Sequence, residues 1–262
     1  MYTESTVPVS ADMSLFVAQS VGDRPLLVIH GGPDWDHTYL RSPVDKVPAH
    51  VVMPDLRGCG RSGKAAEYTP DLAVTDLLGL LDVLGIEQTD ILGFSYGGML
   101  AQRLTLREPH RVRKLIIASS SVVPVPADAF AGWHERDELR KAEAEVWASY
   151  LTGPSLTRAA AFAGAPANVW RNLPEYLRIL AGVRFSAEWV APWLEGRLPP
   201  ARPENASSRL GTLGIPILLL HGRYDMIFPP PPDGVVLDDA GHMAHIDQPE
   251  LWLQAVEEFL NS

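Results

Sequence analysis

Residues 90–99 read Asp-Ile-Leu-Gly-Phe-Ser-Tyr-Gly-Gly-Met, and this stretch decides the fold. Its first half is a short apolar run of the kind that forms a buried parallel strand, and residues 96–107 are expected to form a helix. The turn between them, residues 93–97, matches the pattern G-x-S-x-G. Its glycines allow neighbouring chains to pass closely, and the N–H groups at the start of the helix favour negative charge beside Ser95. We therefore interpret Ser95 as a nucleophile rather than as a serine in an ordinary glycine-rich turn.

The alternation of strand and helix continues on both sides of this stretch. Four further apolar runs are expected to be strands: residues 13–18, 25–30, 50–54 and 114–119. Residues 68–85 have the leucine spacing of a helix, with Thr69 as N-cap, Pro70 as first residue and Gly85 as C-terminal stop. Strands that alternate with helices in this order predict a parallel sheet covered on both faces, an α/β fold.

The alternation stops between residues 122 and 213, where no buried strand is evident. This stretch holds five tryptophans: Trp133, Trp147, Trp170, Trp189 and Trp193. The charge run at residues 134–141 is expected to be a solvated helix face. Most of the tryptophans are expected to fill the core of this segment itself, and Trp133 and Trp147 are the candidates for substrate contact.

The alternation then resumes with two strands and a closing helix, at residues 217–222, 235–239 and 249–259. We therefore expect residues 1–121 and 214–262 to form one core domain. Residues 122–213 are expected to form a helical cap, or lid, inserted between two strands of its sheet.

Composition narrows the classes of partner. The net charge of −10 argues against nucleic acid, whose phosphates require a basic patch, and equally against an anionic membrane surface. Cys59 is the single cysteine, so no internal disulfide forms, and we expect it to be a small packing residue. The chain opens without a basic segment followed by a long apolar run, so we expect no signal peptide, no transmembrane helix and a cytoplasmic location. No histidine cluster has the spacing of metal ligands, so we expect no metal and no cofactor.

With these motifs in place, the chain resembles the α/β-hydrolase superfamily over nearly its whole length apart from the cap. His-Gly-Gly-Pro at residues 30–33 follows an expected strand at the position where that family forms its oxyanion hole. The resemblance implies that the N–H groups of Gly32 and Tyr96 stabilise an oxyanion, each by about 3 kcal/mol. We expect His30 to brace this loop rather than to act as a catalyst.

A second motif of that family lies after the strand at residues 50–54. Residues 55–62, Asp-Leu-Arg-Gly-Cys-Gly-Arg-Ser, match the family's D-x-R-G-x-G-x-S turn. The resemblance implies that Asp55 and Arg57 shape this loop.

A serine hydroxyl needs a base, and the base needs an orienting acid. By resemblance to the family order of Ser, acid and His, Asp225 is the acid and His242 the base. From the residue alone, a turn position would be the commoner role for Asp225. His245 is a rival base, although the Ala-Gly-His sequence that ends at residue 242 favours His242. Asp238 and Asp239 lie too close to His242 in sequence to occupy the acid position.

Two features depart from the family pattern. Only thirteen residues separate His221 from Val235, a crossover that usually carries a helix. Thirteen extended residues span roughly 40 Å, enough to return along a strand, so we expect this helix to be missing or reduced to a turn.

The second departure concerns a subfamily. The sequences HGGP and RGCGRS also resemble proline iminopeptidases, which usually have glycine at the position of Asp34 and tryptophan at that of Tyr96. Asp34 is expected either to bond nearby backbone N–H groups or to receive a substrate ammonium together with a carboxylate of the cap. The cap carboxylates considered are Glu135, Glu138 and Glu143.

The expected function is that of a serine hydrolase which cleaves an ester, lactone or amide of a small, apolar or aromatic substrate. Three other classes stay open on the sequence: an aminopeptidase similar to proline iminopeptidases, a non-hydrolytic enzyme such as a lyase or a cofactor-free oxygenase, and a ligand sensor that retains the same residues. The sequence leaves the oligomeric state undecided.

Overall fold

A computed structural model describes all of residues 1–262. One eight-stranded sheet forms the centre of the molecule, in the order β1-β2-β4-β3-β5-β6-β7-β8. β1 pairs with β2 and β2 with β4 in antiparallel fashion, and all other neighbours are parallel. The strands are β1 (Thr3–Pro8), β2 (Ser14–Gln19), β3 (Pro25–Ile29), β4 (His50–Pro54), β5 (Thr89–Phe94), β6 (Val112–Ala118), β7 (Ile217–Gly222) and β8 (Val235–Leu237). The mostly parallel α/β sheet expected from the sequence is confirmed.

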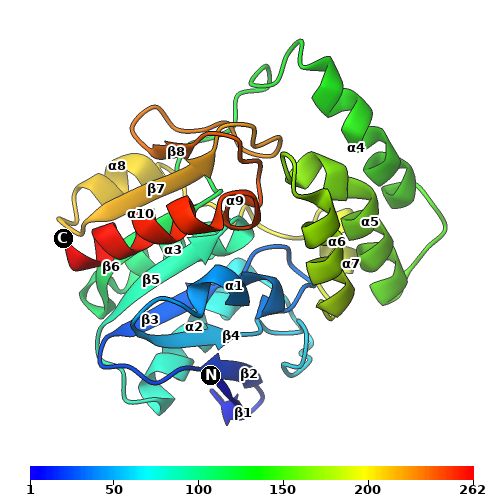
Figure 1. The fold of residues 1–262 in the computed structure, drawn as a ribbon. Coiled ribbons are helices and arrows are strands. Elements are labelled where there is room, and N and C mark those ends of the chain that lie inside the picture. Colours follow the sequence, from blue (N-terminus) through cyan, green and yellow to red (C-terminus); the bar gives the residue numbers. More distant parts are fainter.

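Helices cover both faces of this sheet. The core helices are α1 (Arg41–Val44), α2 (Pro70–Val83), α3 (Tyr96–Arg107), α9 (Ala244–Asp247) and α10 (Pro249–Asn261), with short 3-10 turns η1 (His37–Leu40) and η2 (Pro109–Arg111). In β3, Leu26 and Val28 join the apolar cluster that includes α1 and α10, while Leu27 and Ile29 join the one that includes α2 and α3. Both clusters are buried, so a continuous apolar run is the expected pattern of such a strand. Figure 1 shows α1 and α10 on the near side of the sheet.

Local signals fixed the limits of α2 as expected. Thr69 is its N-cap and accepts a hydrogen bond from the Leu72 N–H at 3.2 Å, and Pro70 occupies the first turn. Gly85, just past the end, has a φ of +68°, a left-handed conformation that glycine adopts without strain.

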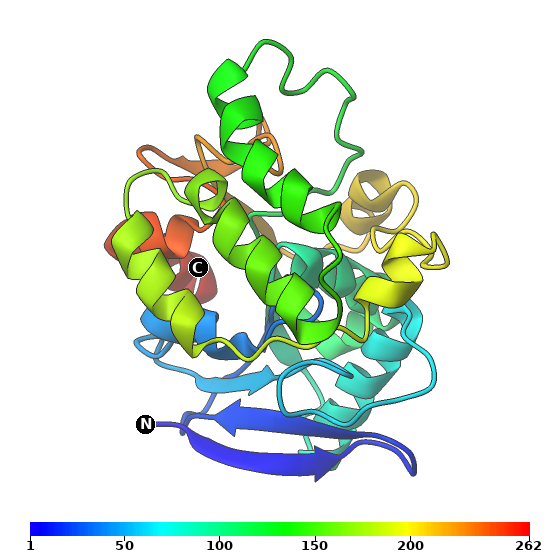
Figure 2. The ribbon, with the colours of Figure 1, turned by 90° about the vertical axis from the view of Figure 1, so that its right-hand side faces the viewer.

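Between β6 and β7 the chain forms five helices and no strand: α4 (His134–Trp147), α5 (Gly153–Asn168), α6 (Leu173–Gly182), α7 (Val190–Leu194) and α8 (Ala206–Gly211). Helix α4, which contains the charge run, buries none of its residues, as expected. Figures 1 and 2 place α4 to α7 together on one side of the sheet. Helix α8 instead contributes Leu210 to the apolar cluster around α2 and α3. The division into a core and a cap with the stated boundaries stays a prediction.

The segment between β7 and β8 contains no helix, as expected from its short, proline-rich sequence.

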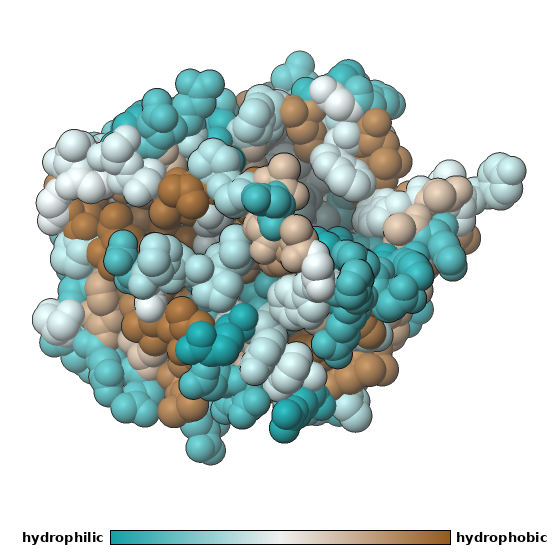
Figure 3. Space-filling model, turned by 90° about the horizontal axis from the view of Figure 1, so that it is seen from above, coloured by the Kyte–Doolittle hydropathy of each residue, from teal (hydrophilic) through white to brown (hydrophobic).

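Two observations concern the surface and the helices as a whole. Seen from above, hydrophobic residues form separate patches among hydrophilic ones (Figure 3). None of the helices is both long and apolar enough to cross a membrane.

Candidate active site

Ser95 sits on a strained turn between β5 and α3. Its backbone angles, φ 53° and ψ −119°, lie outside the regions that residues other than glycine usually adopt. The neighbouring glycines are required by close packing: a Cβ on Gly97 would collide with the backbone oxygen of Ile29, and one on Gly93 would lie 2.7 Å from the Cβ of Ala101. The G-x-S-x-G pattern therefore reflects a turn pressed between β3 and its own helix.

The structure brings Ser95, His242 and Asp225 into one hydrogen-bonded chain. His242 Nε2 lies 3.0 Å from Ser95 Oγ, and His242 Nδ1 lies 2.9 Å from Asp225 Oδ2. The carboxylate accepts the Nδ1 proton, which leaves Nε2 free to accept the hydroxyl proton of Ser95. The other carboxylate oxygen accepts the N–H groups of Ile227 at 2.7 Å and Phe228 at 2.9 Å, so Asp225 is fixed in orientation.

The rival histidine lies elsewhere. His245 is buried with its ring 5.1 Å from the ring of Phe94, and its Nε2 lies 3.2 Å from the backbone oxygen of Tyr39. Burial lowers the pKa of His245 to about 3, despite the hydrogen bond to Tyr39, which acts in the opposite direction. His245 makes no hydrogen bond to Ser95, so the geometry favours His242 as its partner.

Two amides remain free beside Ser95. The N–H of Gly32 has no acceptor within the chain, and the N–H of Tyr96 belongs to the first residue of α3, where helices leave such groups unpaired. A Cβ on Gly31 would lie 2.7 Å from the Cβ of Ser95, so the loop after β3 is in contact with the turn that carries the serine. The contact brings the unpaired N–H of Gly32 near the serine turn, and its role with Tyr96 as an oxyanion hole stays a prediction.

The loop after β3 is held from below by a histidine. His30 Nε2 accepts the N–H of Leu56 at 2.9 Å, and its Nδ1 lies 3.0 Å from the Gly31 carbonyl oxygen, to which it donates. The Gly31 N–H donates to Tyr39 Oη at 2.8 Å. Burial lowers the pKa of His30, so the neutral ring that these bonds require is the stable form. His30 braces the loop, as expected.

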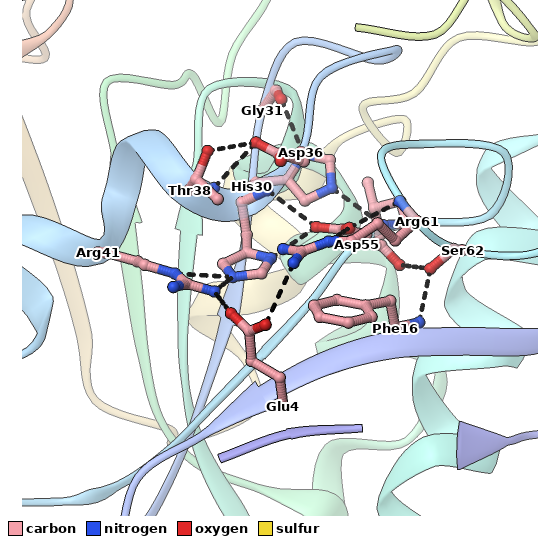
Figure 4. A network of polar contacts seen from close by, with 12 residues as sticks. Glu4, Phe16, His30, Gly31, Asp36, Thr38, Arg41, Asp55, Arg61 and Ser62 are labelled. Atoms are coloured by element: carbon pink, nitrogen blue, oxygen red, sulfur yellow. Dashed lines mark hydrogen bonds and ion pairs between the residues drawn. The ribbon is translucent and has the colours of Figure 1, made fainter. Parts of the chain in front are cut away.

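A buried polar network fixes the β4 end of the same region (Figure 4). Asp55 Oδ1 accepts the Nδ1–H of His37 at 2.6 Å, and Asp55 Oδ2 accepts the N–H of Arg61 at 2.9 Å. Burial acts to raise the pKa of Asp55, but the hydrogen bonds that its carboxylate accepts, that of His37 first among them, outweigh this effect, so the net pKa lies below its usual value. His37 Nε2 in turn accepts from Arg41, which pairs with Glu4.

Arg57 and Cys59 complete this loop. Arg57 forms a bidentate pair with Asp76 of α2, at 2.6 and 2.9 Å, and its backbone oxygen accepts the indole N–H of Trp189 at 2.9 Å. Asp55 and Arg57 therefore shape the loop as expected. Cys59 is fully buried, its Sγ accepts the N–H of Asp34 at 3.3 Å, and burial raises the pKa of its thiol well above the usual value. These surroundings keep the thiol protonated, as befits a packing residue.

A cavity of about 320 Å³ lies beside the loop after β3 and Tyr96, the residue that follows Ser95; neither Ser95 nor His242 is among its lining residues. It is lined from the core by the loop after β3 and by Tyr96, and from the inserted segment by residues of α4, α5 and α7. The lining residues are Gly32, Pro33, Asp34, Trp35, Tyr96, Glu143, Trp147, Thr157, Ala160, Ala161, Asn168, Trp189, Val190, Trp193 and Leu198. Most of this surface is apolar, and four of the residues are tryptophans.

The tryptophans of the inserted segment behave differently from what the sequence indicated. Trp147, Trp189 and Trp193 line the cavity, so the expectation that most of the tryptophans fill the segment's own core is wrong for these three. Trp133 is not among the lining residues and packs against Phe130, with ring centroids 6.2 Å apart. Its distance along α4 explains why: 14 residues of helix place Trp133 about 21 Å from Trp147. The structure therefore brings Trp147 to the cavity and places Trp133 away from it.

Asp34 is fully buried, and its carboxylate is occupied by donors from this chain. Oδ1 accepts the Ser186 hydroxyl and the Trp189 N–H, both at 3.1 Å, and Oδ2 accepts the Val190 N–H at 2.9 Å. Burial raises the pKa of Asp34, and these hydrogen bonds offset part of the increase. The donors lie about 150 residues away in sequence rather than in the same loop, which the sequence did not indicate.

Glu143 is the second acidic residue of the cavity, and it is one of the three cap carboxylates considered from the sequence. Its Oε1 accepts the indole N–H of Trp147 at 3.3 Å, and its Oε2 lies 3.1 Å from Arg140 Nη2. Glu135 and Glu138 do not line the cavity. No group of three or more His, Cys, Asp or Glu side chains is arranged to hold a metal ion.

Two features together point to one family: a serine on a tight strand–helix turn that is hydrogen-bonded to a histidine–aspartate pair, and a mostly parallel sheet with this strand order. The chain belongs to the α/β-hydrolase fold family, whose model matches residues 24–249. It is an α/β-hydrolase enzyme, since its relatives are named as enzymes of this kind, two of them as hydrolases.

One relative is the 2-hydroxymuconate semialdehyde hydrolase of Pseudomonas sp. (strain CF600), 30% identical over 220 residues that cover 78% of this chain and 71% of the relative. A proline iminopeptidase of Lactobacillus delbrueckii subsp. bulgaricus is 35% identical over 113 residues, 40% of this chain and 38% of that protein. Among solved structures, an α/β fold family hydrolase from Bacillus anthracis matches 99% of both chains with a TM-score of 0.76 at 16% identity, a likeness of fold.

Proposed function

We propose that this protein is a serine hydrolase that cleaves an ester, lactone or amide of a small, largely apolar substrate through an acyl-enzyme. The observation that supports it most is the chain of hydrogen bonds from Asp225 through His242 to Ser95, next to an apolar cavity. Helices α4 to α7 act as the cap that encloses the acyl group. The substrate enters as a small molecule, and no cofactor takes part.

The proposed reaction has two steps. Ser95 Oγ attacks the substrate carbonyl carbon while His242 Nε2 takes the hydroxyl proton, and the N–H groups of Gly32 and Tyr96 hold the oxyanion. Collapse of the tetrahedral intermediate breaks the bond to the leaving group, which receives the proton from His242. Water, deprotonated by the same nitrogen, then attacks the acyl carbon and releases the acid and free Ser95.

A fluorophosphonate probe tests this function directly. The folded wild-type protein should be labelled at Ser95, because an activated serine attacks the phosphorus of the probe. The Ser95→Ala variant should stay folded and unlabelled. Folded wild-type protein that resists labelling would contradict the proposed function, and labelling without turnover of any ester, lactone or amide would favour a sensor or a non-hydrolytic enzyme.

The charge of the cavity narrows the substrate class. Its only charged lining residues are the acids Asp34 and Glu143, and no lysine or arginine lines it. The named substrate of the Pseudomonas relative, 2-hydroxymuconate semialdehyde, carries a carboxylate, for which the lining of this cavity offers no cationic partner. We therefore favour a neutral or cationic substrate for this chain. Matched esters of neutral, anionic and cationic acyl groups, compared by kcat/KM, test this preference.

A second function, release of an N-terminal residue from short peptides, is favoured by one specific observation. Glu143 presents a carboxylate to the cavity, where a substrate ammonium would find a partner in competition with Arg140. Glu143→Gln should then lower kcat/KM for an aminoacyl-naphthylamide far more than for a neutral p-nitrophenyl ester. The control is Glu138→Gln, which removes an exposed carboxylate of the same helix that pairs with Lys141. Equal losses on both substrates would argue against the aminopeptidase function.

A further inference from the structure

Asp247 is placed to join two parts of the chain that are far apart in sequence. It ends α9, five residues after His242, and its carboxylate is half-buried. Oδ2 accepts the N–H of Trp170 at 2.8 Å and the N–H of Gly241 at 2.9 Å. Oδ1 accepts the N–H groups of Arg171 at 3.4 Å and Asn172 at 3.3 Å. One carboxylate therefore bonds both the residue next to His242 and residues 170–172, within the stretch 168–172 that leads from the end of α5 to α6.

The contact between these two segments is reciprocal. The N–H of Met243 donates to the backbone oxygen of Asn168 at 2.8 Å, and the Asn172 side-chain amide donates to the backbone oxygen of Ile246 at 2.9 Å. A Cβ on Gly241 would lie 3.1 Å from the Asn168 oxygen, so the two backbones touch at this glycine. Both sequence neighbours of His242 are thus bonded to the α5–α6 connection or to the carboxylate that holds it.

The same connection also reaches the loop of the acid. The indole of Trp170 stacks on the ring of Tyr224, the residue before Asp225, with centroids 3.6 Å apart and planes inclined by 8°. Its Nε1–H donates to Asp239 Oδ1 at 3.2 Å. At its other end the connection lines the cavity through Asn168. Residues 168–172 therefore contact the cavity, the acid loop and the histidine loop at once.

We propose that Asp247 is a positioning residue, which holds His242 in register with Ser95 by fixing the α5–α6 connection against the histidine loop. This inference rests on the proposed function, because it assigns His242 a catalytic role. The physical reason is that four N–H groups from two segments converge on one carboxylate. An amide at this position would offer one acceptor oxygen and turn an NH₂ donor toward the remaining N–H groups, so the two segments would separate together.

The test is Asp247→Asn, with Asp238→Asn as matched control. Asp238 lies in the same loop region, four residues before His242, but its carboxylate is exposed and pairs with Arg223. In Asp247→Asn, hydrogen exchange should rise together in peptides that cover residues 168–172 and 241–243, and remain unchanged in the control. Turnover per fluorophosphonate-titrated site should fall about tenfold or more with little change in KM for a small ester, because misplacement of a catalytic group lowers the rate of the chemical step.

Counting turnover per titrated site separates positioning from a merely structural role, which would lower the amount of folded protein but not the rate of each active site. Exchange that rises in only one of the two segments, or an unchanged rate per site, would overturn the proposal. If Asp247→Asn fails to fold, Asn172→Ala removes one bond of the same contact and should give a smaller, still joint, rise in exchange. A wild-type protein that the fluorophosphonate probe does not label would contradict the proposed function, and with it a catalytic role for His242. Hydrogen exchange decides separately whether residues 168–172 and 241–243 are coupled.

Discussion

The carboxylate of Asp34 accepts the backbone N–H of Trp189 at 3.1 Å, across 155 residues of sequence. Asp34 directly follows the loop that carries the free N–H of Gly32, and it has a positive φ of 78°. Trp189 leads into α7 and is itself almost fully buried. This bond therefore fixes the loop after β3 against the inserted segment on one side of the cavity.

We predict that Asp34→Asn loosens this junction rather than a substrate contact. The amide replaces one acceptor oxygen by a donor that faces an N–H group, at a cost of about 1–3 kcal/mol in the free energy of unfolding. The melting temperature should fall by roughly 2–4 °C for each kcal/mol in a domain of this size. Activity on a neutral ester and on an aminoacyl substrate should change by the same factor. A selective loss of kcat/KM on the aminoacyl substrate would instead show that Asp34 binds its ammonium.

Elements with strong local signals were predictable from the sequence. The limits of α2 follow from Thr69, Pro70 and Gly85, each of which acts within a few residues of itself. β1 was not predicted, because five of its six side chains are exposed and no apolar alternation marks it. Its pairing with β2 is a tertiary contact that single-residue patterns do not encode.

The candidate site also has parts that the sequence predicts and parts that it does not. The grouping of Ser95, Asp225 and His242 was predictable because each residue follows an expected strand in an order that resembles the family's. The cavity was not, since Trp133 and Trp147 lie at opposite ends of α4 and the sequence does not show which end of this helix faces the core. Trp35 lines the cavity from the loop after β3 and was missed. The partners of Asp34 lie so far along the chain that no local signal could indicate them.

We predict opposite consequences for the two neighbouring histidines. His242→Ala should lower kcat by about a thousandfold or more, because Ser95 loses the group that accepts its proton. His245→Phe should retain kcat per fluorophosphonate-titrated site, because His245 contacts Phe94 and Tyr39 rather than Ser95. Steady-state kinetics on a p-nitrophenyl ester measure both. The reverse ranking would overturn the assignment of His242.

We predict that His245 makes the protein less stable in acid. Burial lowers its pKa to about 3 in the folded state, whereas an unfolded histidine titrates near ~6.5. Between these two values the unfolded chain binds the extra proton, so the free energy of unfolding falls as pH falls, by about 1.4 kcal/mol per pH unit from this residue. Above pH ~6.5 both states are neutral and the effect disappears. Urea unfolding of wild type and His245→Phe between pH 7 and 4 should therefore show the free energy of unfolding of the wild type falling relative to that of the variant by about 1.4 kcal/mol per pH unit, and a pH-independent difference would contradict the prediction.

Finally, we predict that Trp147 selects for aromatic acyl groups. It lines the cavity from α4, and its ring packs edge-on against Trp193 with centroids 5.2 Å apart. Trp147→Ala removes apolar contact area, and a loss of about 1.4 kcal/mol corresponds to a tenfold change. The ratio of kcat/KM for p-nitrophenyl phenylacetate to that for p-nitrophenyl acetate should therefore fall about tenfold. Trp133→Ala, at the residue that precedes α4, is the matched control and should leave the ratio unchanged, because Trp133 packs on Phe130 outside the cavity. Equal ratios in the two variants would show that the substrate does not contact Trp147.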